Sequence, residues 1–200
     1  MAKKPKNKDT RILETALAMA EEDGWAGVSL NAVAGRAKVP LTELRRRYRD
    51  ADAIANAWFA RALDAMLEPP PRGFARHPAP ERLEIMMLRW FDTLAPHRRV
   101  TAEMLTQKMW VFHPHHYVPM VFSLSRFIQW LRDAARLDAG GRRRQVEETG
   151  LTMLFLATLA VWCGDETKGQ EHTRSFLRSR LAQADNAMAR LFSKQRKTKG

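Results

Sequence analysis

The chain has 200 residues, of which 45% are hydrophobic, so it is long enough to bury a core and does not have the composition of a disordered polymer. Lysine and arginine total 34 against 22 acidic residues, and the resulting net charge of +12 favours a polyanionic partner, either nucleic acid or an anionic membrane surface. The single cysteine, Cys163, excludes an intrachain disulfide and fits the reducing cytoplasm.

The basic N-terminus, residues 1–8, is expected to be a disordered arm, because no apolar segment of a secretion signal follows it. The longest uncharged apolar run, residues 151–163, is shorter than the roughly 20 residues that a membrane-spanning helix needs. We therefore predict that this run is a buried helix of a soluble protein.

Helical periodicity dominates the chain and predicts an all-α fold, with no hairpin signal or run of alternating polar and apolar residues. The first helix is expected over residues 10–22, capped by Asp9 or Thr10 and ended by Gly24. Trp25 is expected to pack into the core.

Two short helices joined by a tight turn are predicted next. Ser29 is a favourable N-cap for a helix over residues 30–37, and Pro40 can begin another over residues 41–48. In the second of these, Leu44 and Tyr48 lie four residues apart and face the same way. This spacing predicts a helix-turn-helix motif, whereas an ordinary three-helix bundle is the alternative.

The charge around this motif favours the DNA-binding interpretation over a merely solvated helix face. Between Arg36 and Arg49, six cations are opposed by a single acid, Glu43. The candidate DNA-binding residues are Ser29, Arg36, Lys38, Thr42, Arg45, Arg46 and Arg49. We expect Thr42, Arg45 and Arg46 to read bases and the others to contact phosphates.

The rest of the chain offers no catalytic constellation. His113, His115 and His116 lack the spacing of a helical metal-binding pair, and no acid stands within several residues of them. Cys163 lies close to Asp165 and Glu166, which disfavour a thiolate nucleophile. The sequence therefore predicts a protein that is not an enzyme and that needs no cofactor or metal.

Residues 12–54 resemble the TetR family of bacterial transcriptional regulators. The resemblance rests on the glycine-aromatic step Gly24-Trp25, the cap Ser29, the pair Val33-Ala34 and the aromatic Tyr48 that ends the third helix. It implies a DNA-binding, ligand-responsive regulator that pairs as a homodimer through its last two helices and binds a palindromic operator on double-stranded DNA.

Three positions depart from the family pattern. Lys38 stands at the turn position where the family has a glycine, and Arg45 stands where it has a tyrosine. Ala51 replaces a lysine that contacts phosphate at the start of the fourth helix. We expect Lys38 to adopt a left-handed backbone conformation at a cost of about 1 kcal/mol.

The resemblance also divides the chain into expected domains. These are a disordered basic arm (1–8), a helix-turn-helix domain (9–67), a Pro-rich junction (68–80), a helical ligand-binding and dimerisation domain (81–192) and a basic tail (193–200). The C-terminal half is also similar to TetR-fold lipid-binding proteins of ubiquinone biosynthesis, which implies an alternative function. Under that alternative the protein binds an isoprenoid lipid, contacts the membrane and does not bind DNA.

Large apolar side chains of the second half are candidates to line a ligand pocket, although such residues are more often plain core. The candidates are Trp90, Met104, Trp110, Phe127, Trp130, Met153 and Phe155. A pocket of this composition favours a small hydrophobic effector.

Overall fold

The structure is a computed structural model and describes residues 8–108 and 117–193. Within these residues the chain is helical and contains no β-strand, which confirms the predicted all-α class. Packing divides the chain into two compact units, and each is described by itself.

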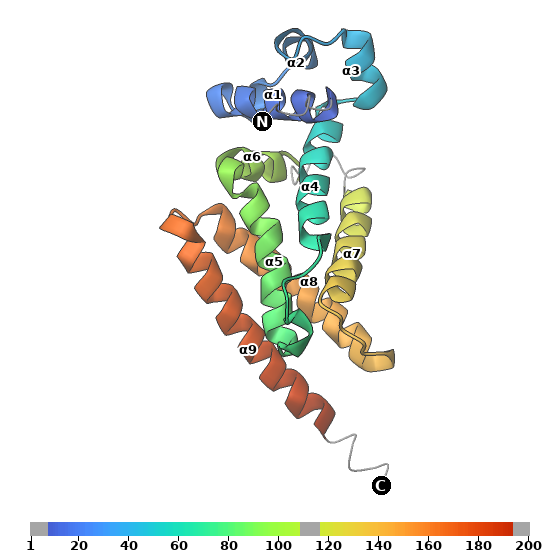
Figure 1. Cartoon of the computed structure of the whole chain (residues 1–200), viewed down its shortest axis with the longest axis vertical. Helices are drawn as coiled ribbons and strands as arrows, with labels where there is room; N and C mark the ends of the chain where they lie inside the picture. The colour runs from blue at the N-terminus through green and yellow to red at the C-terminus, as the bar shows by residue number, and fades with distance from the viewer. Residues whose placement is uncertain (1–7, 109–116, 194–200) are drawn as a thin grey trace. The chain divides into compact units, whose positions relative to one another are not determined.

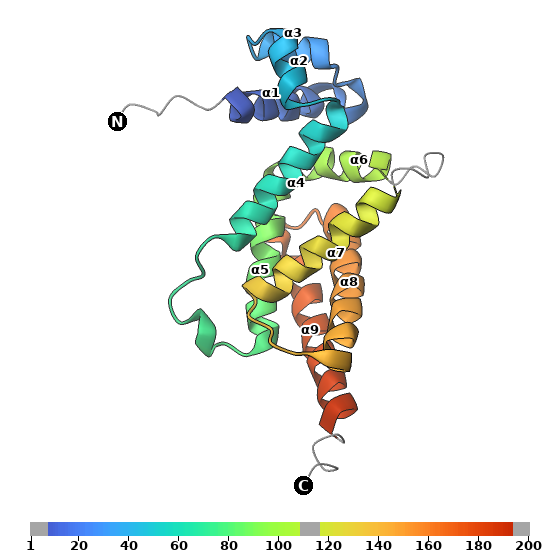
Figure 2. The same cartoon turned by 90° about the vertical axis from the view of Figure 1, so that its right-hand side faces the viewer.

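The first unit contains the described residues 8–62 and 93–108. Its elements are α1 (Lys8–Asp23), the 3-10 turn η1 (Trp25–Gly27), α2 (Leu30–Arg36), α3 (Leu41–Arg47), most of α4 (Ala51–Leu67), η3 (Ala95–His97) and α6 (Arg98–Lys108). In both Figure 1 and Figure 2, α1 lies between the α2–α3 pair and α6. Residues 93–108, which come later in the sequence, therefore help to enclose α1.

Buried apolar side chains and two specific hydrogen bonds hold α6 to this unit. Trp58 of α4 is buried, and its Nε1 donates to the buried Oγ1 of Thr101 over 2.9 Å. The backbone N–H of Trp25 donates to a carboxylate oxygen of Glu103 over 2.7 Å. Trp25 is itself buried, as the sequence predicts, so its polar backbone group finds a partner inside the unit.

The first helix begins earlier than expected. It already includes Lys8, the first described residue, so Asp9 and Thr10 lie within the helix and do not cap it from outside. Lys8 and Asp9 both contact α3, because Lys8 pairs with Glu43 and Asp9 pairs with Arg47. Side-chain pairing over such a sequence separation cannot be recognised from local capping preferences.

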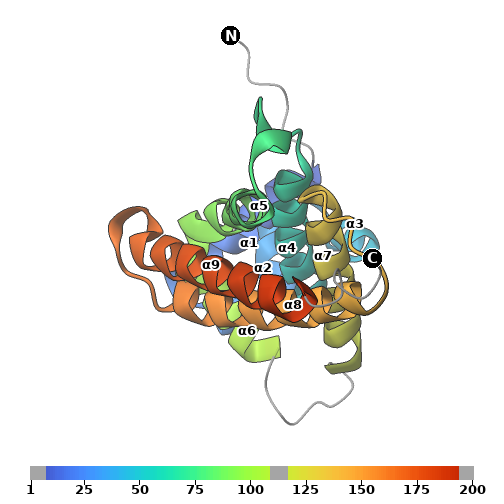
Figure 3. The ribbon, with the colours of Figure 1, turned by 90° about the horizontal axis from the view of Figure 1, so that it is seen from below.

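The second unit contains the described residues 63–92 and 117–193. Its elements are the end of α4, η2 (Phe74–Arg76), most of α5 (Ala79–Leu94), α7 (Tyr117–Ala134), α8 (Gly141–Cys163), η5 (Lys168–Gln170) and α9 (Glu171–Ser193). Figure 3 shows α8 and α9 packed side by side, and the short connection between them makes the pair antiparallel.

The connection between α8 and α9 is organised by a buried carboxylate. Asp165 accepts hydrogen bonds from the backbone N–H and hydroxyl of Thr173, and likewise from Thr167. Burial alone would raise the pKa of Asp165, but these hydrogen bonds outweigh it and lower the pKa well below its usual value. This cap and the left-handed Gly169 precede α9, which begins at Glu171.

The described residues of the chain cover one face of α8. Leu151, Phe155 and Trp162 are buried, whereas Met153 and Leu156 remain 65% and 42% exposed. The predicted buried helix over residues 151–163 is thus buried on one side. By length and composition, α8 is the one helix of the described chain that could cross a membrane. Of the 18 residues in its most apolar segment, 22% are buried in the structure.

Candidate DNA-binding site

The site is built on α2, which begins at the predicted cap. The backbone N–H of Ala32 donates to Ser29 Oγ over 3.2 Å, and Ser29 has the extended backbone typical of an N-cap. Val33 and Ala34 face the interior, whereas the Ser29 and Arg36 side chains are exposed. Helix α2 therefore presents a polar side to solvent and an apolar side to the core.

The turn after α2 has the hydrogen bonds of a Schellman motif. The N–H of Val39 donates to the carbonyl of Ala34 over 3.0 Å, and the N–H of Lys38 donates to that of Gly35 over 3.1 Å. Lys38 occupies the left-handed position with φ of 53°, as predicted, and its side chain is exposed. Val39 is buried beside the motif, so the turn fixes the direction in which α3 leaves.

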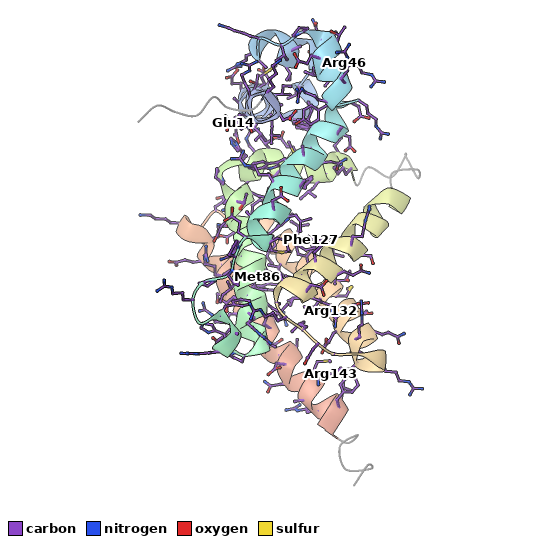
Figure 4. All side chains as sticks on the ribbon, turned by 45° about the vertical axis from the view of Figure 1, so that its right-hand side comes forward. Glu14, Arg46, Met86, Phe127, Arg132 and Arg143 are labelled. Atoms are coloured by element: carbon purple, nitrogen blue, oxygen red, sulfur yellow. The ribbon has the colours of Figure 1, made fainter. Side chains whose placement is uncertain are left out.

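Helix α3 is anchored along one edge by the two residues that the sequence singled out. Leu44 is fully buried and Tyr48 is 8% exposed. Thr42, Arg45 and Arg46 are all exposed, and Figure 4 shows Arg46 on the outer side of α3. The helix-turn-helix motif thus turns its candidate base-reading residues to solvent, as a recognition helix requires.

The cations of the motif differ in whether an acid already accompanies them. Arg36 makes a bidentate pair with Glu22, with both N–O distances at 2.5 Å. Hydrogen bonds from Arg36 accordingly lower the pKa of Glu22. Arg49 pairs with Asp50 over 2.9 Å. Both guanidiniums are exposed, but each would have to leave or share a carboxylate in order to contact phosphate.

Three candidate cations have no ion pair within the part of the chain that the structure describes. They are Lys38 in the turn and Arg45 and Arg46 on α3. Their charges are not locally neutralised, so they contribute most directly to attraction of an anionic partner. The turn and the exposed side of α3 therefore form the most basic part of the motif.

The start of α4 shows how the chain compensates for Ala51. Asp50 caps the helix by accepting the N–H of Ala53 over 2.7 Å. Asp52, in the first turn of α4, forms an ion pair with Lys108 of α6. The helix terminus is thus held by two carboxylates, and the cations beside them are Arg49, which pairs with Asp50, and Lys108 of α6.

Three of the candidate ligand-binding residues come together in the second unit. The Trp90, Phe127 and Phe155 rings, from α5, α7 and α8, have centroid separations of 4.5–5.6 Å. Figure 4 labels Phe127 on α7. These rings form an aromatic cluster that is compatible with an apolar ligand or with plain core packing.

The other candidates are distributed differently. Trp130 and Met153 are 52% and 65% exposed, so they face solvent in the isolated chain. Met104 is buried in the first compact unit, on α6. Trp110 lies outside the described residues, as do His113, His115 and His116. Among the residues that are described, no group of three or more His, Cys, Asp or Glu side chains is placed to hold a metal.

The sequence alone missed the ionic contacts between α1 and α3. Lys8, Asp9 and Arg47 were not among the candidates, and Glu43 stood out only as the acid that opposes the cations. The opposite charges of Glu43 and Arg47, four residues apart on α3, were the available sign of an ionic cluster. Their partners on α1 are more than thirty residues away in the sequence, so the sequence did not reveal them.

Comparison with solved structures finds proteins that superpose on most of the chain. A TetR transcriptional regulator from Nitrosomonas europaea ATCC 19718 is 35% identical and superposes with a TM-score of 0.78, covering 88% of this chain and 97% of its own. A TetR transcriptional regulator from Rhodococcus sp. RHA1 gives 19% identity and a TM-score of 0.61, with coverage of 90% and 96%. A tetR-family transcriptional regulator from Streptomyces coelicolor is 15% identical and superposes with a TM-score of 0.66, covering 96% of this chain and 86% of its own.

The last two likenesses concern the fold alone, whereas the first also extends to the sequence. No protein-family model matches the chain, and no curated protein sequence matches it significantly. The three solved relatives are all described as transcriptional regulators, so they give no support to the lipid-binding alternative.

Proposed function

The chain belongs to the TetR family of transcriptional regulators, a family of DNA-binding proteins, and from this premise we propose that it acts as a homodimer on a two-fold symmetric operator. One observation carries the DNA-binding part of this proposal. Leu44 and Tyr48 hold α3 to the core while Arg45 and Arg46 project from it, without an ion pair among the described residues. Such a helix can place two guanidiniums against the base edges of a major groove.

The residues of the motif divide into two roles. Thr42, Arg45 and Arg46 read bases, and an arginine bidentate to guanine discriminates by about 1–3 kcal/mol. Lys38 neutralises a phosphate from the turn, because its side chain is exposed and its charge is uncompensated.

Three further residues help to fix the protein on the DNA backbone. Ser29 already accepts a hydrogen bond through Oγ, which leaves its hydroxyl hydrogen able to donate to a phosphate. Arg36 and Arg49 are weaker phosphate ligands than Lys38, since each must compete with its own carboxylate, Glu22 or Asp50. The backbone contacts position the motif but carry no sequence information.

The uncovered face of α8 supports the dimer. Val146, Met153 and Ala160 are exposed and recur every seven residues, and Leu156 lies on the same side. A seven-residue apolar repeat favours packing against another helix, and within the chain α8 already packs against α7 and α9. A second copy would cover this surface in a four-helix bundle of two α8–α9 pairs.

The aromatic cluster of the second unit supports a small hydrophobic effector. Trp90, Phe127 and Phe155 come from three different helices, so a ligand inserted among them would change how those helices pack. An effector that favours one arrangement would thereby change the spacing of the two recognition helices in the dimer. DNA as the partner places the protein in the cytoplasm.

Selection of genomic duplexes by the purified protein, followed by footprinting, tests the proposal. We expect a preferred site with two protected half-sites in adjacent or near-adjacent major grooves, related by two-fold symmetry. The absence of any duplex bound better than random DNA at about 0.15 M salt would reject the proposal.

A further inference from the structure

Four charged side chains join the first turn of α1 to one edge of α3, and we call this group the α1–α3 clamp. Lys8 Nζ lies 2.8 and 3.2 Å from the two carboxylate oxygens of Glu43. Arg47 donates to Asp9 over 2.6 Å and to Glu43 over 3.4 Å. The charges alternate, so each cation of the clamp contacts at least one acid.

The pKa directions of two members agree with this geometry. Hydrogen bonds from Lys8, and then from Arg47, lower the pKa of Glu43. A hydrogen bond to Asp9 raises the pKa of Arg47. Both shifts favour the charged forms of Glu43 and Arg47, which are the forms that the ion pairs of the clamp require.

The clamp attaches α3 along a second edge. Leu44 and Tyr48 already bury one edge, and a single edge leaves a short helix able to rotate about that line of contact. Helix α3 has seven residues, so tertiary contacts must define its setting. Glu43 and Arg47 are four residues apart on α3, and both contact α1. Two contacts one helical turn apart restrict rotation of α3 about its own axis.

The clamp also explains why only part of the arginine run is available to DNA. Arg47 is directed to the acids of the clamp, whereas its neighbours Arg45 and Arg46 are exposed without an ion pair in the described residues. The only acid between Arg36 and Arg49, Glu43, is compensated by Lys8 and Arg47. The clamp thus absorbs the acid and one arginine and leaves two arginines on the open side.

We propose that Lys8, Asp9, Glu43 and Arg47 are positioning residues that fix the rotation of α3 and so determine operator specificity without touching DNA. This role rests on the proposed function as an operator-binding regulator. The clamp holds Arg45 and Arg46 at the angle that a bidentate base contact requires. When it is broken, the arginines still attract phosphates but meet base edges less accurately.

The sign of the expected effect distinguishes positioning from simple charge. Asp9→Asn or Glu43→Gln removes a negative charge near the DNA-binding surface, and electrostatics alone would strengthen binding to every duplex alike. Loss of positioning instead lowers the ratio of operator affinity to random-duplex affinity. We expect this ratio to fall about fivefold or more, as for one weakened base contact, while random-duplex affinity stays equal or rises.

The experiment measures both affinities across a salt series for wild type, Asp9→Asn, Glu43→Gln, Arg47→Gln and the Asp9→Asn/Arg47→Gln pair. Asp23→Asn, an exposed acid at the other end of α1, is the matched control and should leave the ratio unchanged. The double variant should lose no more specificity than Arg47→Gln alone, because both changes break the same contact. Thermal melting confirms that each variant is folded, as expected for exposed pairs worth about 0–1 kcal/mol.

Two results would overturn the role of the clamp while leaving the proposed function intact. In one, the wild type prefers an operator and every clamp variant keeps its affinity ratio. In the other, Arg47→Gln lowers the slope of log affinity against log salt concentration by about 0.9, which identifies Arg47 as a phosphate ligand. A wild type that prefers no duplex overturns the proposed function, and the role of the clamp with it.

Discussion

Replacing Lys38 by glycine should make the protein more stable, although the change removes a side chain. Lys38 has φ of 53° at the left-handed position of the Schellman motif after α2. A side chain with a Cβ costs roughly 1–2 kcal/mol in this conformation, whereas glycine has no such penalty. The Lys38 side chain is exposed and makes no ion pair among the described residues, so its removal loses little.

Glycine also has a disadvantage, because it raises the entropy of the unfolded chain by roughly 0.5–1 kcal/mol relative to alanine. The net gain for Lys38→Gly is therefore up to about 1 kcal/mol, or a rise in melting temperature of about 2–4 °C for a chain of this size. Lys38→Ala is the control, because it removes the same charge but keeps the Cβ. Thermal denaturation followed by circular dichroism should place Lys38→Gly above Lys38→Ala and the wild type.

The same two variants test the role of the Lys38 charge on DNA. If Lys38 contacts a phosphate, both variants should lower the slope of log affinity against log salt concentration by about 0.9, and by equal amounts. A Lys38→Gly protein that melts below Lys38→Ala would refute the argument from backbone strain. Unchanged salt slopes in both variants would refute the phosphate contact.

Three further changes test other parts of the structure. Glu22→Gln removes the carboxylate that competes with phosphate for Arg36. The affinity for random duplex should rise several-fold, and the slope of log affinity against log salt concentration should steepen by up to about 0.9. Unchanged binding would mean that Arg36 does not reach DNA. Met153→Glu places a charge on the uncovered face of α8 and should shift the protein toward monomer in sedimentation, whereas Gln129→Glu on exposed α7 should not. The fold lowers the pKa of Asp165, so the stabilising contribution of this carboxylate is fully present above its unfolded pKa of about 3.9 and is lost as the pH falls below that value. Asp165→Asn should therefore lower the melting temperature more at pH 7 than at about pH 3. Equal losses at the two pH values would contradict the argument.

Local patterns in the sequence predicted the helix-turn-helix motif well, because its determinants are local. The cap at Ser29, the left-handed turn at Lys38 and the buried pair Leu44 and Tyr48 are all confirmed. Each depends on a backbone conformation or a helical spacing within a few residues. Such features can be recognised without knowledge of tertiary contacts.

Contacts between distant segments could not be predicted in the same way. Helix α1 includes Lys8, two residues before the expected start, and the pairing of Lys8 with Glu43 joins residues that no periodicity connects. Packing also brings residues 93–108 into the first unit, so Met104 belongs to a different unit from the aromatic cluster. The exposure of Trp130 is likewise invisible to a pattern that assigns large apolar side chains to the core.

The measurement that tests the account most directly is the ratio of operator affinity to random-duplex affinity, for the wild type and for Arg45→Ala/Arg46→Ala. Arg142→Ala/Arg143→Ala provides the charge-matched control on α8, and Arg142→Ala alone is a second control. The account predicts that the α3 variant loses at least about tenfold in the ratio, whereas the α8 variants retain it. Equal ratios in the α3 variant and the wild type would contradict the assignment of α3 as the recognition helix.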